Sequence, residues 1–146
     1  MYKRILVPVD GSECAFKALD VAVELIDKPE GALCLLHVVP DAALPEGLEE
    51  WATAEHVSES TEWLYEHSIG QRIIDAAHRR ANALGCENLE HMVGHGDPAA
   101  EIVERAKGAD AIVIGTTGLG KLKGLMMGSV AQKVIFHAEG TVIAVR

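Results

Sequence analysis

Glycine and hydroxyl residues are spaced for phosphate binding in the last third of the chain. The segment Gly115-Thr116-Thr117-Gly118 is followed by nine residues and then by Gly128-Ser129. Glycine at positions 115 and 118 lets the backbone approach phosphate oxygens closely and permits positive φ angles that other residues disfavour. Successive N–H groups in such a loop form an anion-binding nest without a basic side chain. The spacing therefore predicts a phosphate site built mainly from backbone.

Gly128 and Ser129 stand at the predicted start of the last helix. The first N–H groups of a helix have no partners within it, and the positive end of the helix dipole favours a phosphate. The Ser129 hydroxyl is expected to donate to that phosphate. A structural interpretation stays open, in which Ser129 and Gln132 form a Ser-x-x-Gln capping box and the glycines only make a flexible loop.

Two other phosphate motifs fit the same segment poorly. Gly115-x-x-x-x-Gly120-Lys121 resembles a P-loop, but Leu122 stands where that motif needs Ser or Thr to hold Mg²⁺. Gly118-x-Gly120 followed by Gly124 has one residue too many for the dinucleotide fingerprint, which also belongs after a first strand.

The elements that would position these residues alternate along the chain, as in a parallel sheet covered by helices. The predicted strands are residues 5–9, 33–39, 89–93, 111–114 and 141–145. Ser12 and Asp97-Pro98 are helix-start signals. Ligands bind such a sheet beyond the carboxyl ends of its strands, so strands one and four should flank the crevice.

Two connecting segments have different characters. Residues 41–60 are acidic and irregular and are predicted to form a long loop. The helix before the third strand is expected to bury an apolar stripe made of Ile69, Ile73, Ala77 and Leu84.

Composition excludes several classes of protein. The chain has 146 residues, a hydrophobic fraction of 49% and a formal net charge of −9. It is therefore long enough for one domain, residues 1–146, and too acidic for a nucleic-acid or anionic-membrane surface. Three cysteines are expected to be reduced core residues, and no apolar run reaches the roughly 20 residues of a membrane span. We expect a cytoplasmic protein without membrane insertion.

Several segments carry a resemblance to a known family. They are the opening residues 5–12, Leu36-His37-Val38-Val39, Gly96-Asp97-Pro98, the Gly-x-x-Gly spacing and Gly128-Ser129-Val130-Ala131. In this order they resemble the ATP-binding branch of the universal stress protein family. The resemblance implies an open five-stranded parallel sheet of order 3-2-1-4-5, Rossmann-like, with two helices on each face.

The same resemblance implies roles for individual residues toward ATP. Pro8, Val9 and Asp10 would border the nucleotide, with Asp10 near the ribose or a phosphate-bound Mg²⁺, and Val38 would meet adenine through its main chain. The ribose and phosphates would be held by Gly115, Thr117, Gly118, Gly128, Ser129 and Val130. Thr117 departs from the family, in which His or Arg is common at this position.

The implied function is that of a nucleotide-dependent regulator in the stress response, acting on an unknown protein partner. The residues favour binding over turnover, because Asp10 is the one convincing acidic candidate and hydrolysis also needs a placed base and a charge stabiliser. The alternatives are a nucleotide-independent interaction module, a binder of AMP or cyclic AMP, and a slow ATPase.

The last predicted strand, residues 141–145, favours self-association. It is apolar, it is expected at an edge of the sheet, and it carries no proline or inward charge that would protect the edge. The sequence therefore predicts a homodimer through this strand, as the family resemblance also implies.

Overall fold

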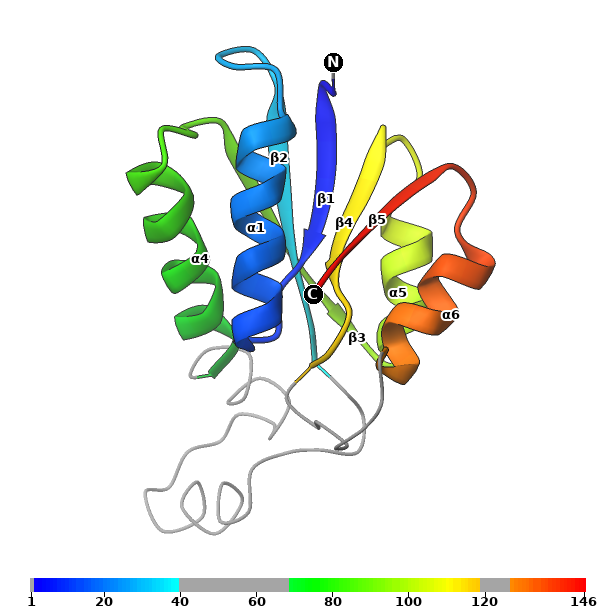
Figure 1. The fold of residues 1–146 in the computed structure, drawn as a ribbon. Coiled ribbons are helices and arrows are strands. Elements are labelled where there is room, and N and C mark those ends of the chain that lie inside the picture. The colour runs from blue at the N-terminus through cyan, green and yellow to red at the C-terminus, as the bar shows by residue number, and fades with distance from the viewer. Residues whose placement is uncertain (1, 40–68, 119–126) are drawn as a thin grey trace, which may run out of the picture.

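The computed structural model describes residues 2–39, 69–118 and 127–146, and Figure 1 shows their arrangement. Five parallel strands form one sheet in the order β3-β2-β1-β4-β5. The strands are β1 (Arg4–Pro8), β2 (Ala32–Val39), β3 (Leu89–His95), β4 (Ala111–Gly115) and β5 (Thr141–Val145). The helices are α1 (Glu13–Leu25), α4 (Gln71–Ala83), α5 (Pro98–Arg105) and α6 (Ser129–His137). The predicted α/β fold and strand order are confirmed, and the predicted loop at residues 41–60 lies outside the described residues.

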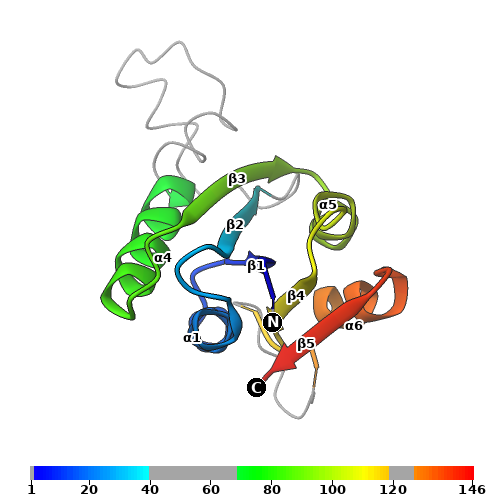
Figure 2. The same ribbon diagram turned by 90° about the horizontal axis from the view of Figure 1, so that it is seen from above.

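Helices cover both faces of the sheet (Figure 2). Leu19 of α1 and Ala77 of α4 share one buried cluster with Ile5 of β1. Ile102 of α5 and Val134 of α6 belong to a second cluster, on the opposite face. The central strands are therefore buried on both sides, which explains why their sequences are apolar throughout.

Capping side chains fix where two of the helices begin. Ser12 is the N-cap of α1, and its hydroxyl accepts a hydrogen bond from the N–H of Ala15 at 3.2 Å. Asp97 caps α5 in the same way through the N–H of Ala100 at 3.0 Å, and Pro98 is the first helical residue. Both predicted start signals are confirmed. They begin α1 and α5 at the end of the molecule where the strands finish (Figure 1).

The buried stripe of α4 differs from the predicted one. Its buried residues are Ile74, Ala77 and Ala81, whereas Ile73 is only partly buried. Leu84 follows the last helical residue and is 46% exposed. The prediction assumed that the helical period continued to Leu84, but the helix ends at Ala83.

Two expectations from composition can be compared with the described residues. Cys14, Cys34 and Cys86 are all free and buried, as predicted. Among the helices of residues 2–39, 69–118 and 127–146, none combines the length and apolar character that crossing a membrane requires.

Candidate functional site

A cavity of about 330 Å³ lies at the carboxyl end of the sheet. Residues that end β1, β2 and β4 form its floor, and residues from the first turns of α1, α5 and α6 form its walls. From β1 the chain continues to β2 on one side, and from β4 it continues to β5 on the other. The cavity therefore occupies the point where the strand order reverses, which is the usual ligand position in open α/β sheets.

The cavity brings together all ten residues that the sequence assigned to a nucleotide. Three of them lie at the end of β1 and just after it, one belongs to β2, three surround the end of β4, and three lie at the start of α6. They are Pro8, Val9, Asp10, Val38, Gly115, Thr117, Gly118, Gly128, Ser129 and Val130.

The cavity is also lined by nine residues that the sequence analysis did not assign to the nucleotide. They are Ser12, Ala15, Leu36, His37, Pro98, Ile102, Ile114, Thr116 and Ala131. Most of them form apolar wall, for which sequence reasoning has no chemical signal. His37 is different, because it is 2% exposed and its Nδ1 lies 2.9 Å from the carbonyl oxygen of Val9. A carbonyl only accepts, so Nδ1 carries the hydrogen. A histidine inside an otherwise apolar strand is the signal that would have found it.

The glycines of the loop are required for space, and the expectation of positive φ angles is wrong. The glycines with positive φ lie elsewhere, and neither Gly115 nor Gly118 is among them. A Cβ on Gly115 would lie 2.8 Å from the carbonyl carbon of Cys14 and 2.9 Å from its oxygen. A Cβ on Gly118 would lie 2.7 Å from Oδ2 of Asp10. Gly115 thus lets α1 pack against β4, whereas Gly118 leaves room for a carboxylate.

Asp10 presents its carboxylate to the cavity from the turn between β1 and α1. Its Oδ1 accepts a hydrogen bond from the N–H of Ser12 at 2.9 Å. Its Oδ2 faces the position where Gly118 has no side chain. Among the cavity residues that the structure describes, Asp10 is the only carboxylate, and Lys and Arg do not occur. From these described residues, an anionic ligand therefore meets one negative charge, that of Asp10, and otherwise only dipoles.

Helix α6 begins at the cavity without a side-chain cap. Gly128 is the N-cap, and no side chain caps this helix within the described residues. The side-chain amide of Gln132 donates to the carbonyl of Met127 at 2.8 Å, so the Ser-x-x-Gln capping box is wrong. Gly128, Ser129 and Val130, at the start of this helix, line the cavity, and the helix dipole favours a negative group at this end.

Cys14 lies behind the loop, in the first turn of α1. Burial raises the pKa of its thiol, but hydrogen bonds with Thr117 and Thr116 lower it, and the resulting pKa is below the ordinary value for cysteine. For Cys34 and Cys86 the effect of burial is the dominant one, so the pKa of both thiols lies above the ordinary value. Of the three cysteines, Cys14 is thus the one whose thiol pKa is lowered by hydrogen bonds with the loop residues Thr116 and Thr117.

Comparison with known proteins assigns the chain to a family. The family model described as "Universal stress protein family" matches residues 1–146. The universal stress protein YxiE of Bacillus subtilis is 33% identical, and the alignment covers 100% of both chains.

Solved structures agree with this assignment. The structure of universal stress protein UspA from Lactobacillus plantarum has a TM-score of 0.76 and 28% identity, covering 99% of this chain and 98% of that one. A universal stress protein in complex with cAMP (TM-score 0.68, 24% identity, 99% and 97% covered) shares the fold. So does the Archaeoglobus fulgidus protein in complex with dAMP (TM-score 0.69, 23% identity, 99% and 98% covered). The chain belongs to the universal stress protein family.

Proposed function

We propose that this protein binds an adenine nucleotide, ATP with Mg²⁺, in the cavity at the carboxyl end of the sheet and acts as a nucleotide-dependent regulator. The observation that carries the proposal is the start of α6. Its first turn, which has no side-chain cap among the described residues, lines the same cavity as the Gly115–Gly118 loop. Dipoles from two backbone segments thus converge on one space, which suits a phosphate chain.

The proposed roles follow the positions of the lining residues. Val38, Pro8 and Val9 all line the cavity. Val38, on the β2 side, is assigned to adenine, and Pro8 and Val9 are assigned to the border of the nucleotide. The phosphates are assigned to the loop formed by Gly115, Thr117 and Gly118 and to the α6 start formed by Gly128, Ser129 and Val130. This division places the apolar wall against the base and the backbone N–H groups against the charge.

Mg²⁺ fits the site as a partner of the ligand. Asp10 offers Oδ2 toward Gly118, while Oδ1 accepts from Ser12. Within the described residues, no group of three or more His, Cys, Asp or Glu side chains could hold a metal alone. Mg²⁺ is commonly held by one or two carboxylates together with phosphate oxygens. When bound, it would neutralise the repulsion between Asp10 and the phosphates.

The complexes of relatives with cAMP and dAMP favour a second candidate, a ligand with a single phosphate. Such a ligand carries less negative charge past Asp10 than ATP does. Binding rather than hydrolysis is proposed in either case, because one carboxylate close to the phosphates repels an attacking hydroxide as readily as it orients a water. A nucleotide-independent interaction module is the competing function.

The ligand is tested in two steps. Mass spectrometry identifies the small molecules released from freshly purified protein, and calorimetry then measures ATP, AMP, cyclic AMP and GTP with and without Mg²⁺. Release of an adenine nucleotide, with rebinding of adenine ligands and not of GTP, supports the proposal. The proposal is refuted if no adenine nucleotide is released and no adenine ligand binds at millimolar concentration.

A variant pair tests the role of Asp10. Asp10→Asn is expected to reduce the Mg²⁺-dependent part of ATP affinity, since the amide cannot neutralise a cation. Asp20→Asn is the matched control, because Asp20 lies on α1 and only forms an exposed ion pair with Arg80 at 2.6 Å. A Mg²⁺ dependence that survives Asp10→Asn removes the metal role.

We also propose a homodimer through β5. Val145 directs its carbonyl toward the β4 side, where it accepts from the N–H of Thr116 at 2.8 Å. Backbone groups alternate in direction along a strand, so those of Val142 and Ala144 face the open edge. Phe136, which is 84% exposed, lies in α6 just before this strand. A second copy paired at this edge would satisfy the outward N–H and C=O groups.

A further inference from the structure

Thr116 connects three segments that are distant in sequence. It follows β4 directly, and only 4% of it is exposed. Its N–H donates to the carbonyl of Val145 at 2.8 Å, and its own carbonyl accepts from the N–H of Gly128. Its Oγ1 lies 3.8 Å from Sγ of Cys14. The residue therefore touches the end of β5, the start of α6 and the start of α1.

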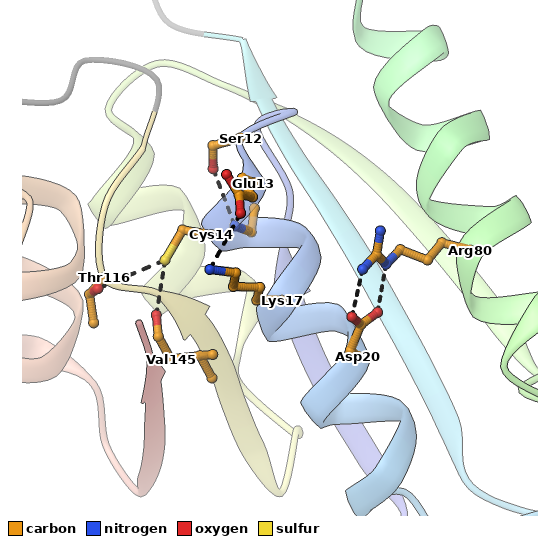
Figure 3. A network of polar contacts seen from close by, with 9 residues as sticks. Ser12, Glu13, Cys14, Lys17, Asp20, Arg80, Thr116 and Val145 are labelled. Carbon is orange, nitrogen blue, oxygen red and sulfur yellow. Dashed lines mark hydrogen bonds and ion pairs between the residues drawn. The ribbon is translucent and has the colours of Figure 1, made fainter.

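The Cys14 thiol contacts the same carbonyl. Its Sγ donates to the oxygen of Val145 at 3.0 Å, and the side chain points toward both Thr116 and Val145 (Figure 3). One carbonyl at the end of the edge strand thus receives two donors, a thiol from α1 and an amide from the loop. We call Cys14, Thr116 and Val145 the junction.

The junction has little room for independent movement. Gly115 is packed so closely on α1 that a Cβ there would meet the Cys14 backbone at 2.8 Å. A shift of Thr116 therefore presses on Cys14 or loosens the bond to Val145. Because close-packed groups move together, the position of the loop and the position of the β5 end depend on each other.

Thr116 of the junction also lines the cavity. Thr117 and Gly118 follow Thr116, and Gly128, which donates to Thr116, begins α6; all of these line the cavity. A ligand that bridges the loop and the α6 start would therefore hold the bond between Gly128 and Thr116 closed. Thr116 in turn donates its N–H to the carbonyl of Val145, so the same ligand would also favour this bond.

We propose that Cys14 and Thr116 are positioning residues that couple ligand binding in the cavity to the order of the β5 edge. The coupling rests on the proposed nucleotide binding, and it gives the site a way to regulate self-association. Linkage is reciprocal, so pairing of β5 with a second copy raises nucleotide affinity by the factor by which nucleotide raises dimer affinity. Couplings of this kind typically amount to about 5- to 150-fold.

Amide hydrogen exchange on the intact protein measures the junction directly. Mg²⁺-ATP is expected to slow exchange of the Thr116 N–H by at least about 5-fold, because this N–H makes the bond to Val145. The N–H of Asp110, which donates to the carbonyl of Arg4 at 2.8 Å at the opposite end of the sheet, is the internal control. Calorimetry on the same sample shows whether ATP is bound.

Three cysteine variants separate positioning from simple stability. Cys14→Ala removes the thiol donor, Cys14→Ser restores a donor, and Cys86→Ala is a control in another buried cysteine. For each, sedimentation gives the dimer dissociation constant with and without Mg²⁺-ATP. We expect the ratio of the two constants to fall toward 1 in Cys14→Ala, and to stay near the wild-type ratio in Cys14→Ser and Cys86→Ala.

The outcomes distinguish the two proposals. If ATP binds but neither Thr116 exchange nor the dimer constant changes, the coupling is refuted and nucleotide binding stands. If ATP and the other adenine nucleotides do not bind, the proposed function fails and the coupling falls with it. A ratio that is unchanged in Cys14→Ala refutes the role of the thiol.

Discussion

Substitution by alanine should have different effects at the two glycines of the loop: Gly115→Ala should lower stability, and Gly118→Ala should lower the affinity for Mg²⁺-ATP. Gly115→Ala places a Cβ 2.8 to 3.0 Å from backbone atoms of Cys14 and Ala15. Backbone in the first turn of a packed helix cannot move away cheaply, and overpacking of this kind costs about 1–3 kcal/mol. The free energy of unfolding should fall by that amount.

Gly118→Ala places its Cβ 2.7 Å from Oδ2 of Asp10, which is the end of a side chain and can rotate. Because φ at this position is not positive, alanine can adopt the native backbone conformation. Alanine also reduces the conformational entropy of the unfolded chain, which stabilises the folded protein by about 0.4–1 kcal/mol and offsets much of the strain. Stability should therefore change by less than about 1 kcal/mol. Displacement of the Asp10 carboxylate should instead weaken ligand binding. The expected loss is about 1.5–3 kcal/mol of binding free energy, the usual contribution of a hydrogen bond to a charged group. Mg²⁺-ATP affinity should fall about 10- to 150-fold.

Denaturant unfolding and calorimetry with Mg²⁺-ATP measure the two effects separately. A double variant provides the control: Asp10→Ala removes the atom that the new Cβ meets, so adding Gly118→Ala to it should cost little further affinity. Losses that add in the double variant would refute the contact with Asp10 as the cause. Equal stability losses for Gly115→Ala and Gly118→Ala would refute the distinction between backbone and side-chain crowding.

Three further predictions concern the helix start, the edge strand and the sheet's far end. Ser129→Ala should weaken ATP more than adenosine in calorimetry, by about 1.5–3 kcal/mol, because only ATP carries phosphates to the start of α6; equal losses would make Ser129 a structural residue. Val142→Pro and Ala144→Pro should convert a dimer to a monomer in sedimentation at micromolar concentration, because each removes an edge-facing donor that β4 does not use; a dimer that persists in both would place the interface elsewhere. The pKa of Asp110 is lowered because its carboxylate accepts hydrogen bonds from the N–H groups of Arg4 and Lys3, at 2.9 and 2.8 Å. Its folded-state pKa lies below the unfolded value of about 3.9, so its contribution to stability is present at neutral pH and is lost as pH falls through the folded pKa. Urea unfolding of Asp110→Ala and of the parent protein should therefore show a gap that narrows on acidification, and a constant gap would contradict the assignment.

The fold was predictable because its signals are local and agree with one another. Apolar runs such as residues 111–114 have no alternation, so they had to be buried on both faces, and the caps Ser12 and Asp97 marked where helices follow. The location of the cavity followed from topology, since the carboxyl ends of the strands in a parallel sheet meet at one edge. His37 and Thr116 were missed because their importance lies in contacts with Val9 and Val145, which sequence spacing does not encode.

The reasons for particular residues were harder to predict than their positions. Gly115 and Gly118 were expected to need unusual dihedral angles, but each is required because a neighbour from another segment approaches closely. The Ser129–Gln132 motif matched a capping box, yet the Gln132 amide contacts Met127. In both cases local sequence patterns competed with tertiary contacts that only the folded chain defines.

The close approach of Gly115 to α1 has an evolutionary consequence. A relative that lost its ligand would still need glycine at this position, because the residue that it accommodates is the Cys14 backbone. The position of Gly118 is under a different constraint, since among the described residues its size is limited by the carboxylate of Asp10, in the turn between β1 and α1. Substitution of Gly118 together with Asp10, with Gly115 retained, would therefore mark relatives in which the proposed nucleotide site is lost while the fold is kept. Gly115 is thus needed for the packing of α1 against β4, whereas Gly118 is needed for the carboxylate in the proposed ligand site.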